Sequence, residues 1–132
     1  MESGLQYHGT TACRGGNEPL DFGGIWVNQF GSTLELCVTG NAVTGRFESA
    51  VGDENQTVWV GLCGRVLNDL ITFNVAYERY HTVISWTGRL SSDGGKPIIN
   101  ALWLHVSDTS DDQQRAGPWS STRIGADVFR RA

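Results

Sequence analysis

Residues Gly24–Ser32, with the sequence GIWVNQFGS, hold the pattern from which the rest of the chain can be interpreted. The first half of this stretch alternates as strand residues do, its middle is short and contains glycine, and Ser32 begins a second alternating run. The pattern predicts a β-hairpin in which Trp26, Asn28 and Ser32 face the same side. An amide and a hydroxyl that converge beside an indole can donate two hydrogen bonds to one acceptor oxygen. We therefore expect a ligand-binding group here, provided that other strands complete a pocket.

Seven further strand-like segments follow, without a convincing helical pattern. Short turns rich in glycine, asparagine and aspartate separate most of them. A meander of eight strands removes its two edges most economically by closing on itself. The sequence therefore predicts an all-β fold, an eight-stranded antiparallel up-and-down β-barrel whose interior holds side chains and one small ligand. The expected segments after the first are residues 32–39, 43–51, 57–66, 70–77, 81–90, 97–106 and 121–130.

The length of 132 residues is enough for one domain with a closed core. Residues 1–22 are rich in glycine, serine and threonine and have no periodicity, so we expect a flexible N-terminal arm before a barrel domain at residues 23–132. The formal net charge is -4, and no basic stripe alternates with aromatic residues, so nucleic acid is not an expected partner.

No apolar run approaches the roughly 20 residues that a membrane span needs, so no membrane partner is expected. The N-terminus also lacks the basic and then apolar pattern of a signal peptide. The location therefore stays open: secreted if a leader was removed, and cytoplasmic otherwise.

The sequence has three cysteines, an odd number, so at least one thiol is free or pairs outside the chain. Cys37 and Cys63 fall on outward positions of strands that lie two spacings apart, roughly 10 Å. A disulfide needs Cα atoms within about 7 Å, so we predict no Cys37–Cys63 bond. Cys13, on the arm, could reach elsewhere, but the preferred interpretation is that all three are reduced thiols.

The inward positions combine aromatic walls with a few polar groups, as a small-molecule site requires. A single aromatic is more often core packing, but a buried polar group without a partner costs about 1 to 3 kcal/mol. The polar groups must therefore satisfy one another, bind water or bind a ligand. A carboxylate at Asp127 beside amide and hydroxyl donors suits a ligand that carries N–H groups. The residues expected at the mouth of the barrel are Asn28, Ser32, Phe47, Ser49, Tyr77, Thr82, Ile84, Trp86, Trp103 and Asp127.

Three ordered motifs resemble those of the avidin and streptavidin family. Residues 24–33 resemble its first hairpin, residues 43–52 (VTGRFESAVG) its third strand and the following loop, and residues 119–129 (WSSTRIGADVF) its last strand. The resemblance covers about residues 23–130. It implies a barrel that binds biotin without catalysing a reaction and without a cofactor.

The resemblance also implies how the head of biotin would be held. Asn28 and Ser32 would donate hydrogen bonds to the ureido oxygen. Ser49 and Asp127 would accept from the two ureido N–H groups. Asp127 would in addition polarise this network through Asn28.

The tail of the ligand is assigned in the same way. Tyr77, Trp86 and Trp103 would flank the bicyclic ring and the valeryl chain, with Tyr77 in place of a usual tryptophan. Thr82 and the loop Val51–Asp53 would meet the carboxylate. A further residue, Trp119, would reach into the neighbouring subunit's pocket, which favours a homotetramer.

Several positions depart from the family's pattern. Phe47 stands where a tyrosine usually gives a third hydrogen bond to the ureido oxygen, a loss worth about 1 to 3 kcal/mol. Ile84 replaces a threonine near the ring sulfur. His105 occupies a usually aliphatic inward position, and we expect a hydrogen-bonded structural residue rather than a metal ligand, because His8 and His81 show no ligand spacing with it. We therefore expect tight biotin binding, but weaker than in a relative with the full donor set.

Other function classes remain open at this point. One alternative is a lipocalin-like carrier of another small apolar ligand, with biotin binding weakened; a ligand that biotin does not displace would identify it. An enzyme is not expected, because no paired carboxylate, Ser-His-Asp set, metal cluster or glycine-rich phosphate loop accompanies Asp127. A purely structural oligomer would show no stabilisation by a ligand. Apolar outer positions, Leu102, Leu104 and Ile124, favour self-association.

Overall fold

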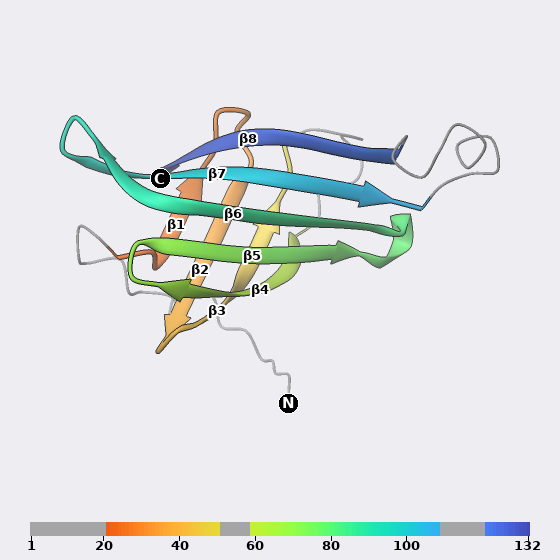
Figure 1. Cartoon of the computed structure of the whole chain (residues 1–132), viewed down its shortest axis with the longest axis horizontal. Helices are drawn as coiled ribbons and strands as arrows, with labels where there is room; N and C mark the ends of the chain where they lie inside the picture. The colour runs from red at the N-terminus through yellow and green to blue at the C-terminus, as the bar shows by residue number, and fades with distance from the viewer. Residues whose placement is uncertain (1–20, 51–58, 109–120) are drawn as a thin grey trace.

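A computed structural model describes residues 21–50, 59–108 and 121–132, and its strands close into a single barrel (Figure 1). Each strand pairs antiparallel with the next one along the chain, and β8 returns to pair with β1. The predicted eight-stranded up-and-down β-barrel is therefore confirmed. The elements are β1 (Gly24–Val27), β2 (Thr33–Thr39), β3 (Ala42–Glu48), β4 (Trp59–Leu67), β5 (Leu70–Tyr77), the 3-10 helix η3 (Glu78–Tyr80), β6 (Thr82–Asp93), β7 (Lys96–Ser107) and β8 (Thr122–Arg131). None of the helical turns in the described ranges is long and apolar enough to cross a membrane.

Tight turns set the register of the strands. Gly94 and Gly95 have φ values of 60° and 82°, a left-handed conformation that glycine adopts without steric cost. This turn places Asp93 opposite Lys96, and the pairing of β6 with β7 then continues over the full length of both strands. Register decides which side chains point inward, since successive residues of a strand face opposite sides. The turn sequences therefore determine which residues can reach the interior.

The hydrophobic core fills the half of the barrel in which β6 ends and β7 begins. Leu90 pairs with Ile99 there, and Ile99 pairs in turn with Phe129 on β8. Above this layer Phe73 stacks on Trp86, with ring centroids 4.9 Å apart. The packed half leaves the opposite end, where β6 begins and β7 ends, as the mouth of the barrel.

The predicted arm, residues 1–22, lies outside the described residues except for its last two. Phe22 is buried in the core cluster, and its carbonyl oxygen accepts a hydrogen bond from the indole nitrogen of Trp26 at 2.9 Å. The Arg131 guanidinium donates to the carbonyl oxygens of Asp21 and Gly23 and lies 4.4 Å from the centre of the Trp26 ring. The end of the predicted arm is therefore part of the barrel's packing.

The cysteines differ from one another. Cys37 is buried and disulfide-bonded, whereas Cys63 is an exposed free thiol. The prediction that no Cys37–Cys63 bond forms is confirmed, but the interpretation of all three as reduced thiols is wrong. The spacing of the strands excluded that one pairing and placed no limit on a bond to a residue beyond the strands. The third cysteine, Cys13, lies outside the described residues.

Candidate functional site

A cavity of about 150 Å³ lies at the mouth of the barrel, where several strands and the β1–β2 turn contribute to its wall. Strand alternation turns the lining side chains of β3, β6, β7 and β8 inward together. All of the lining residues except Phe30 belong to the predicted site. The cavity is lined by Asn28, Phe30, Ser32, Phe47, Ser49, Ile84, Trp86, Trp103, His105 and Asp127.

Tyr77 and Thr82 line a neighbouring depression of about 340 Å³ instead of this cavity. The Thr82 hydroxyl donates to the carbonyl oxygen of Tyr80 at 3.0 Å and lies 3.0 Å from the Ser107 hydroxyl. Burial raises the pKa of the Tyr77 phenol above its ordinary value. The two residues pair with each other one layer beyond Ile84, so they lie on the rim rather than in the wall. The other predicted contacts lie outside the described residues: Val51, Asp53 and Trp119.

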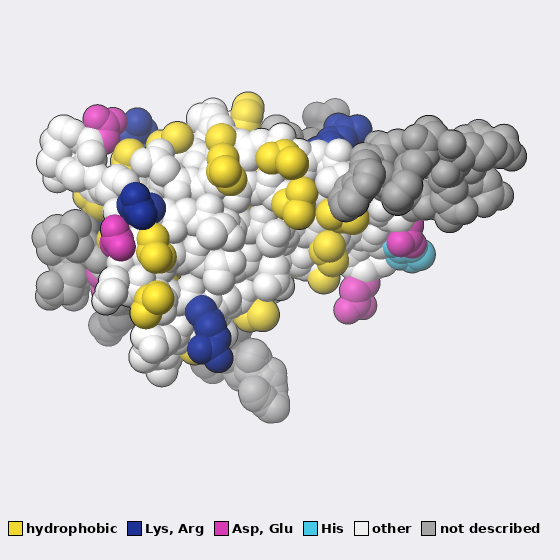
Figure 2. Space-filling model, viewed as in Figure 1, with side chains coloured by type: hydrophobic (Ala, Val, Ile, Leu, Met, Phe, Trp, Pro, Cys, Tyr) yellow, Lys and Arg dark blue, Asp and Glu magenta, His cyan; other side chains and the backbone are white. Residues whose placement is uncertain are grey.

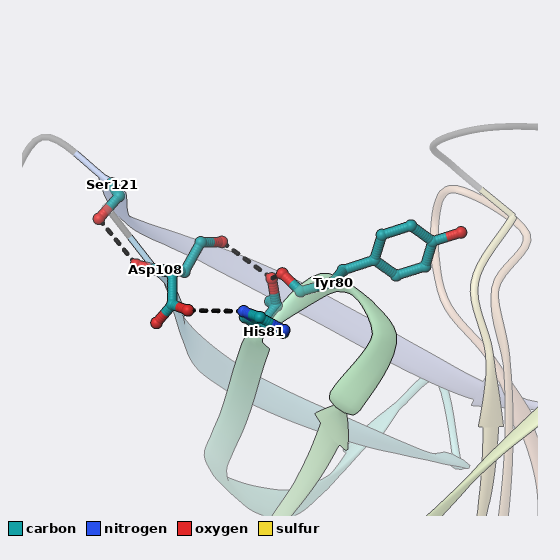
Figure 3. Close-up of polar contacts among 6 residues, drawn as sticks. Tyr80, His81, Asp108 and Ser121 are labelled. Atoms are coloured by element: carbon teal, nitrogen blue, oxygen red, sulfur yellow. Dashed lines mark hydrogen bonds and ion pairs between the residues drawn. The ribbon is translucent and has the colours of Figure 1, made fainter. Parts of the chain in front are cut away.

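Figure 3 shows polar contacts that join the ends of neighbouring strands at the mouth of the barrel. The Nδ1 atom of His81 lies 2.7 Å from a carboxylate oxygen of Asp108, and the Asp108 N–H donates to the His81 carbonyl oxygen at 3.0 Å. The Ser121 hydroxyl donates to the carbonyl oxygen of Ser107 at 2.9 Å and so ties β8 to β7. Both members of the ion pair are largely exposed, so it contributes little to stability.

The β1–β2 turn fixes the orientation of the Asn28 amide. Its Oδ1 accepts hydrogen bonds from the backbone N–H groups of Phe30 at 3.0 Å and Ser32 at 2.9 Å. Since the oxygen is held by two donors, the NH₂ group must take the other position. No acceptor for this NH₂ group is found among residues 21–50, 59–108 and 121–132. The turn therefore presets Asn28 as a hydrogen-bond donor in the cavity wall.

Ser32 is a second preset donor. Its side chain is buried, and its hydroxyl oxygen accepts a hydrogen bond from the backbone N–H of Ala50 at 2.9 Å. The hydroxyl hydrogen remains for another acceptor. The same contact fixes the segment after β3, and the preceding residue, Ser49, lines the cavity.

Asp127 brings a buried carboxylate to the site. Its Oδ2 accepts a hydrogen bond from the indole N–H of Trp86 at 2.9 Å. The predicted link from Asp127 through Asn28 is absent from the described part of the chain, because the Trp86 side chain on β6 provides the partner. The other oxygen, Oδ1, has no donor among the described residues and is left to accept from a ligand.

His105 differs from its prediction. Its Nδ1 atom is buried and has no hydrogen-bond partner among the described residues, so the expected hydrogen-bonded structural role is wrong. Its neighbours across the strands explain this, since Ile84 has no polar side-chain atom and Arg123 is exposed. The described residues also contain no group of three potential metal ligands. Among the described residues the His105 ring therefore has neither a hydrogen-bond partner at Nδ1 nor the companions of a metal site.

The family model described as the Avidin family matches residues 17–132. The chain belongs to the avidin family. Proteins of the avidin family bind biotin and are not catalysts, so the chain is a binding protein rather than an enzyme, and biotin is the family's ligand and not a cofactor. No curated protein matches the chain in sequence.

Solved structures with avidin-type names share the fold. The crystal structure of xenavidin has 25% sequence identity and a TM-score of 0.75, and the match covers 87% of this chain and 100% of that one. Apo shwanavidin has 28% identity and a TM-score of 0.69, covering 82% and 96%. The rhizavidin–biotin complex has 26% identity and a TM-score of 0.68, covering 83% and 91%.

One wall of this avidin-family cavity depends on a glycine. A Cβ atom at Gly125 would lie 2.1 Å from Cζ2 of Trp103, so the indole lies directly against the backbone of β8. Sequence alternation placed Trp103 correctly in the wall but gave no sign of this close contact. It also missed Phe30, because an exposed aromatic in a turn has no periodic pattern to assign it.

Gly125→Ala is expected to weaken ligand binding by about tenfold and to destabilise the fold by about 1 to 3 kcal/mol, because the indole must move to admit the methyl group. Calorimetry and chemical denaturation measure the two effects. Gly61→Ala is the matched control, since a Cβ there meets no atom within 4 Å. Equal behaviour of the two variants would show that the Trp103 contact has no role.

Proposed function

We propose that this chain binds biotin itself, with the ureido group held by Asn28, Ser32 and Asp127. The observation that carries the proposal is the fixed polarity of these groups. Asn28 and Ser32 have their acceptor atoms occupied by backbone N–H groups and so offer donors, while Asp127 offers a free carboxylate oxygen. A cyclic urea has one acceptor oxygen flanked by N–H donors, which is the complementary arrangement.

The apolar part of the ligand would lie against the aromatic wall. Trp86 packs between Phe47, at a centroid distance of 5.0 Å, and Phe73, at 4.9 Å, so its indole is held rigidly on the cavity side. Trp103 pairs with Trp86 across β6 and β7 and extends the same wall. A preformed aromatic wall lowers the entropy cost of binding a flat ring.

Calorimetric titration of the purified chain with biotin tests the proposal. We expect saturation at one site per chain, together with a rise in thermal stability at excess biotin. If the titration shows no binding and excess biotin does not raise the thermal stability, the proposal is rejected. Tight binding of an apolar ligand that biotin does not displace would instead identify a carrier for another compound.

Phe47→Tyr is expected to raise the affinity for biotin by about tenfold, because the new hydroxyl can add a hydrogen bond to the ureido oxygen. Phe47 lines the cavity and is buried. Competition against a labelled biotin measures the change. An unchanged or reduced affinity, with the unfolding midpoint preserved, would contradict the idea that the missing hydroxyl limits binding.

We also propose that the chain assembles as a homotetramer. Figure 2 shows hydrophobic side chains spread over the face formed by β6, β7 and β8. The outward residues Leu102 and Ile124 are 64% and 73% exposed, and such a patch usually marks an interface. Light scattering should give four times the mass of one chain, and Leu102→Glu should lower it. A monomeric or dimeric mass for the unmodified chain would contradict the proposal.

A further inference from the structure

His105 has an unpaired hydrogen-bonding atom in the cavity wall. Its Nδ1 is buried and meets no partner among the described residues, although the ring lines the cavity. A buried polar atom without a partner costs about 1 to 3 kcal/mol, and native proteins rarely leave one unless something else binds it. Among the described residues it is the one side-chain nitrogen or oxygen that is both closed off from solvent and without a partner. The ring therefore brings to the cavity wall a hydrogen-bonding capacity that the described residues do not use.

The register places His105 above the head of the proposed ligand. Asp127 pairs with Ala101 on β7, and His105 lies four residues further towards the mouth. At about 3.4 Å per residue this is about 14 Å along the strand. When a ureido group is at Asp127, the side chain of the ligand extends towards the mouth and past the layer formed by Ile84 and His105.

The charges around the ring favour an anion. Among the described residues, the titratable or charged groups that face it are Arg123, which pairs with it across β8, Asp127 deeper on the same strand, and Tyr77 on β5 at the rim. On β6 the neighbouring inward residues are Ile84 and Trp86, and neither side chain carries a charge. Near the mouth, the His105 ring and the Arg123 guanidinium therefore offer hydrogen-bond donors. None of the neighbours named here places a carboxylate beside them.

We propose that His105 determines specificity for the end of the ligand's side chain by donating a hydrogen bond from its imidazole ring to a carboxylate there. The inference rests on the proposed function, because it takes the head of the ligand to lie at Asp127. The occupant of this position is an anionic or strongly accepting group. For biotin this group is the carboxylate of the valeryl chain.

Two ligands separate the role of His105 from a structural one. One is biotin, and the other is a biotin analogue whose carboxyl group is replaced by a methyl group. His105→Leu is expected to lower the affinity for biotin by about 10- to 100-fold, since a hydrogen bond to a charged group is lost, and to change the affinity for the analogue by less than about threefold. His105→Gln should recover most of the affinity for biotin, because its amide can donate.

The pH dependence supplies an independent readout. Histidine changes its charge between about pH 5 and pH 8. From about pH 8 to about pH 5.5 the unmodified chain should bind biotin more tightly and the methyl analogue less tightly, because the charged ring attracts a carboxylate and resists an apolar chain. Both trends should vanish in His105→Leu and persist in His81→Asn, which removes the other described histidine from outside the cavity.

The outcomes are distinct. An equal loss for both ligands in a folded His105→Leu, or no loss for either, would overturn the role of His105 while leaving biotin binding intact. If this variant does not fold, the pH trends of the unmodified chain and of His105→Gln decide the question, and parallel trends for both ligands overturn the inference. Failure of the unmodified chain to bind both ligands would instead remove the proposed function and this inference with it.

Discussion

Asp127→Ala is expected to weaken biotin binding by about two to three orders of magnitude. The substitution removes the acceptor proposed for a ureido N–H, a charge-assisted hydrogen bond worth about 1.5 to 3 kcal/mol. It also leaves the Trp86 indole N–H, which donates to Asp127 at 2.9 Å in a buried position, without its acceptor. That second effect costs about 1 to 3 kcal/mol of folding stability, and it loosens the aromatic wall on which the ligand packs, which adds to the loss of affinity. Displacement of labelled biotin, with calorimetry for the weakened variant, measures the loss.

Asp127→Asn is the matched control for this result. Its amide oxygen can still accept from Trp86, so the wall is kept, while its NH₂ group replaces the oxygen that would accept from the ureido N–H. We expect an affinity between those of the unmodified chain and Asp127→Ala. A loss of less than about tenfold in Asp127→Ala would mean that the carboxylate has no central part in binding.

Arg46→Leu is expected to lower the free energy of unfolding by about 2 to 4 kcal/mol, because it leaves a buried carboxylate without its positively charged partner. Glu35 is 2% exposed, and its carboxylate pairs with Nε of Arg46 at 2.8 Å. The guanidinium also lies 4.1 Å from the centre of the Trp59 ring, so its removal costs packing as well. The pair is on the outer face of β2 and β3, away from the cavity. Urea denaturation at neutral pH measures the loss.

A double variant isolates the charge. Glu35→Gln combined with Arg46→Leu removes both charges, and it should recover most of the stability lost in the single variant. The affinity for biotin should change little in either, since neither residue lines the cavity. If the double variant is as unstable as Arg46→Leu, the loss comes from the packing of the arginine and not from the buried carboxylate.

The barrel was predictable from the sequence because its two signals are local. Alternation with a period of two and turn residues such as Gly94 and Gly95 determine strands, turns and register together. The same alternation brings Trp86, Trp103 and Asp127 to one interior. Most of the cavity wall follows from these patterns without any knowledge of contacts.

The parts that could not be predicted depend on contacts between distant residues. The position of Thr82 on the rim follows from the stagger of the closed barrel, which alternation does not encode. The bond between Trp86 and Asp127 joins residues 41 positions apart, and the close packing of Gly125 against Trp103 is visible only in three dimensions. The disulfide at Cys37 was missed because strand spacing constrains pairs within the barrel alone.

The crystal structure of the complex with biotin tests the central claim most directly. It should show the ureido oxygen within about 3.2 Å of both Asn28 Nδ2 and Ser32 Oγ, and a ureido nitrogen at the same distance from Asp127 Oδ1. Biotin bound with its head towards the mouth, or outside the cavity lined by these residues, would contradict the account.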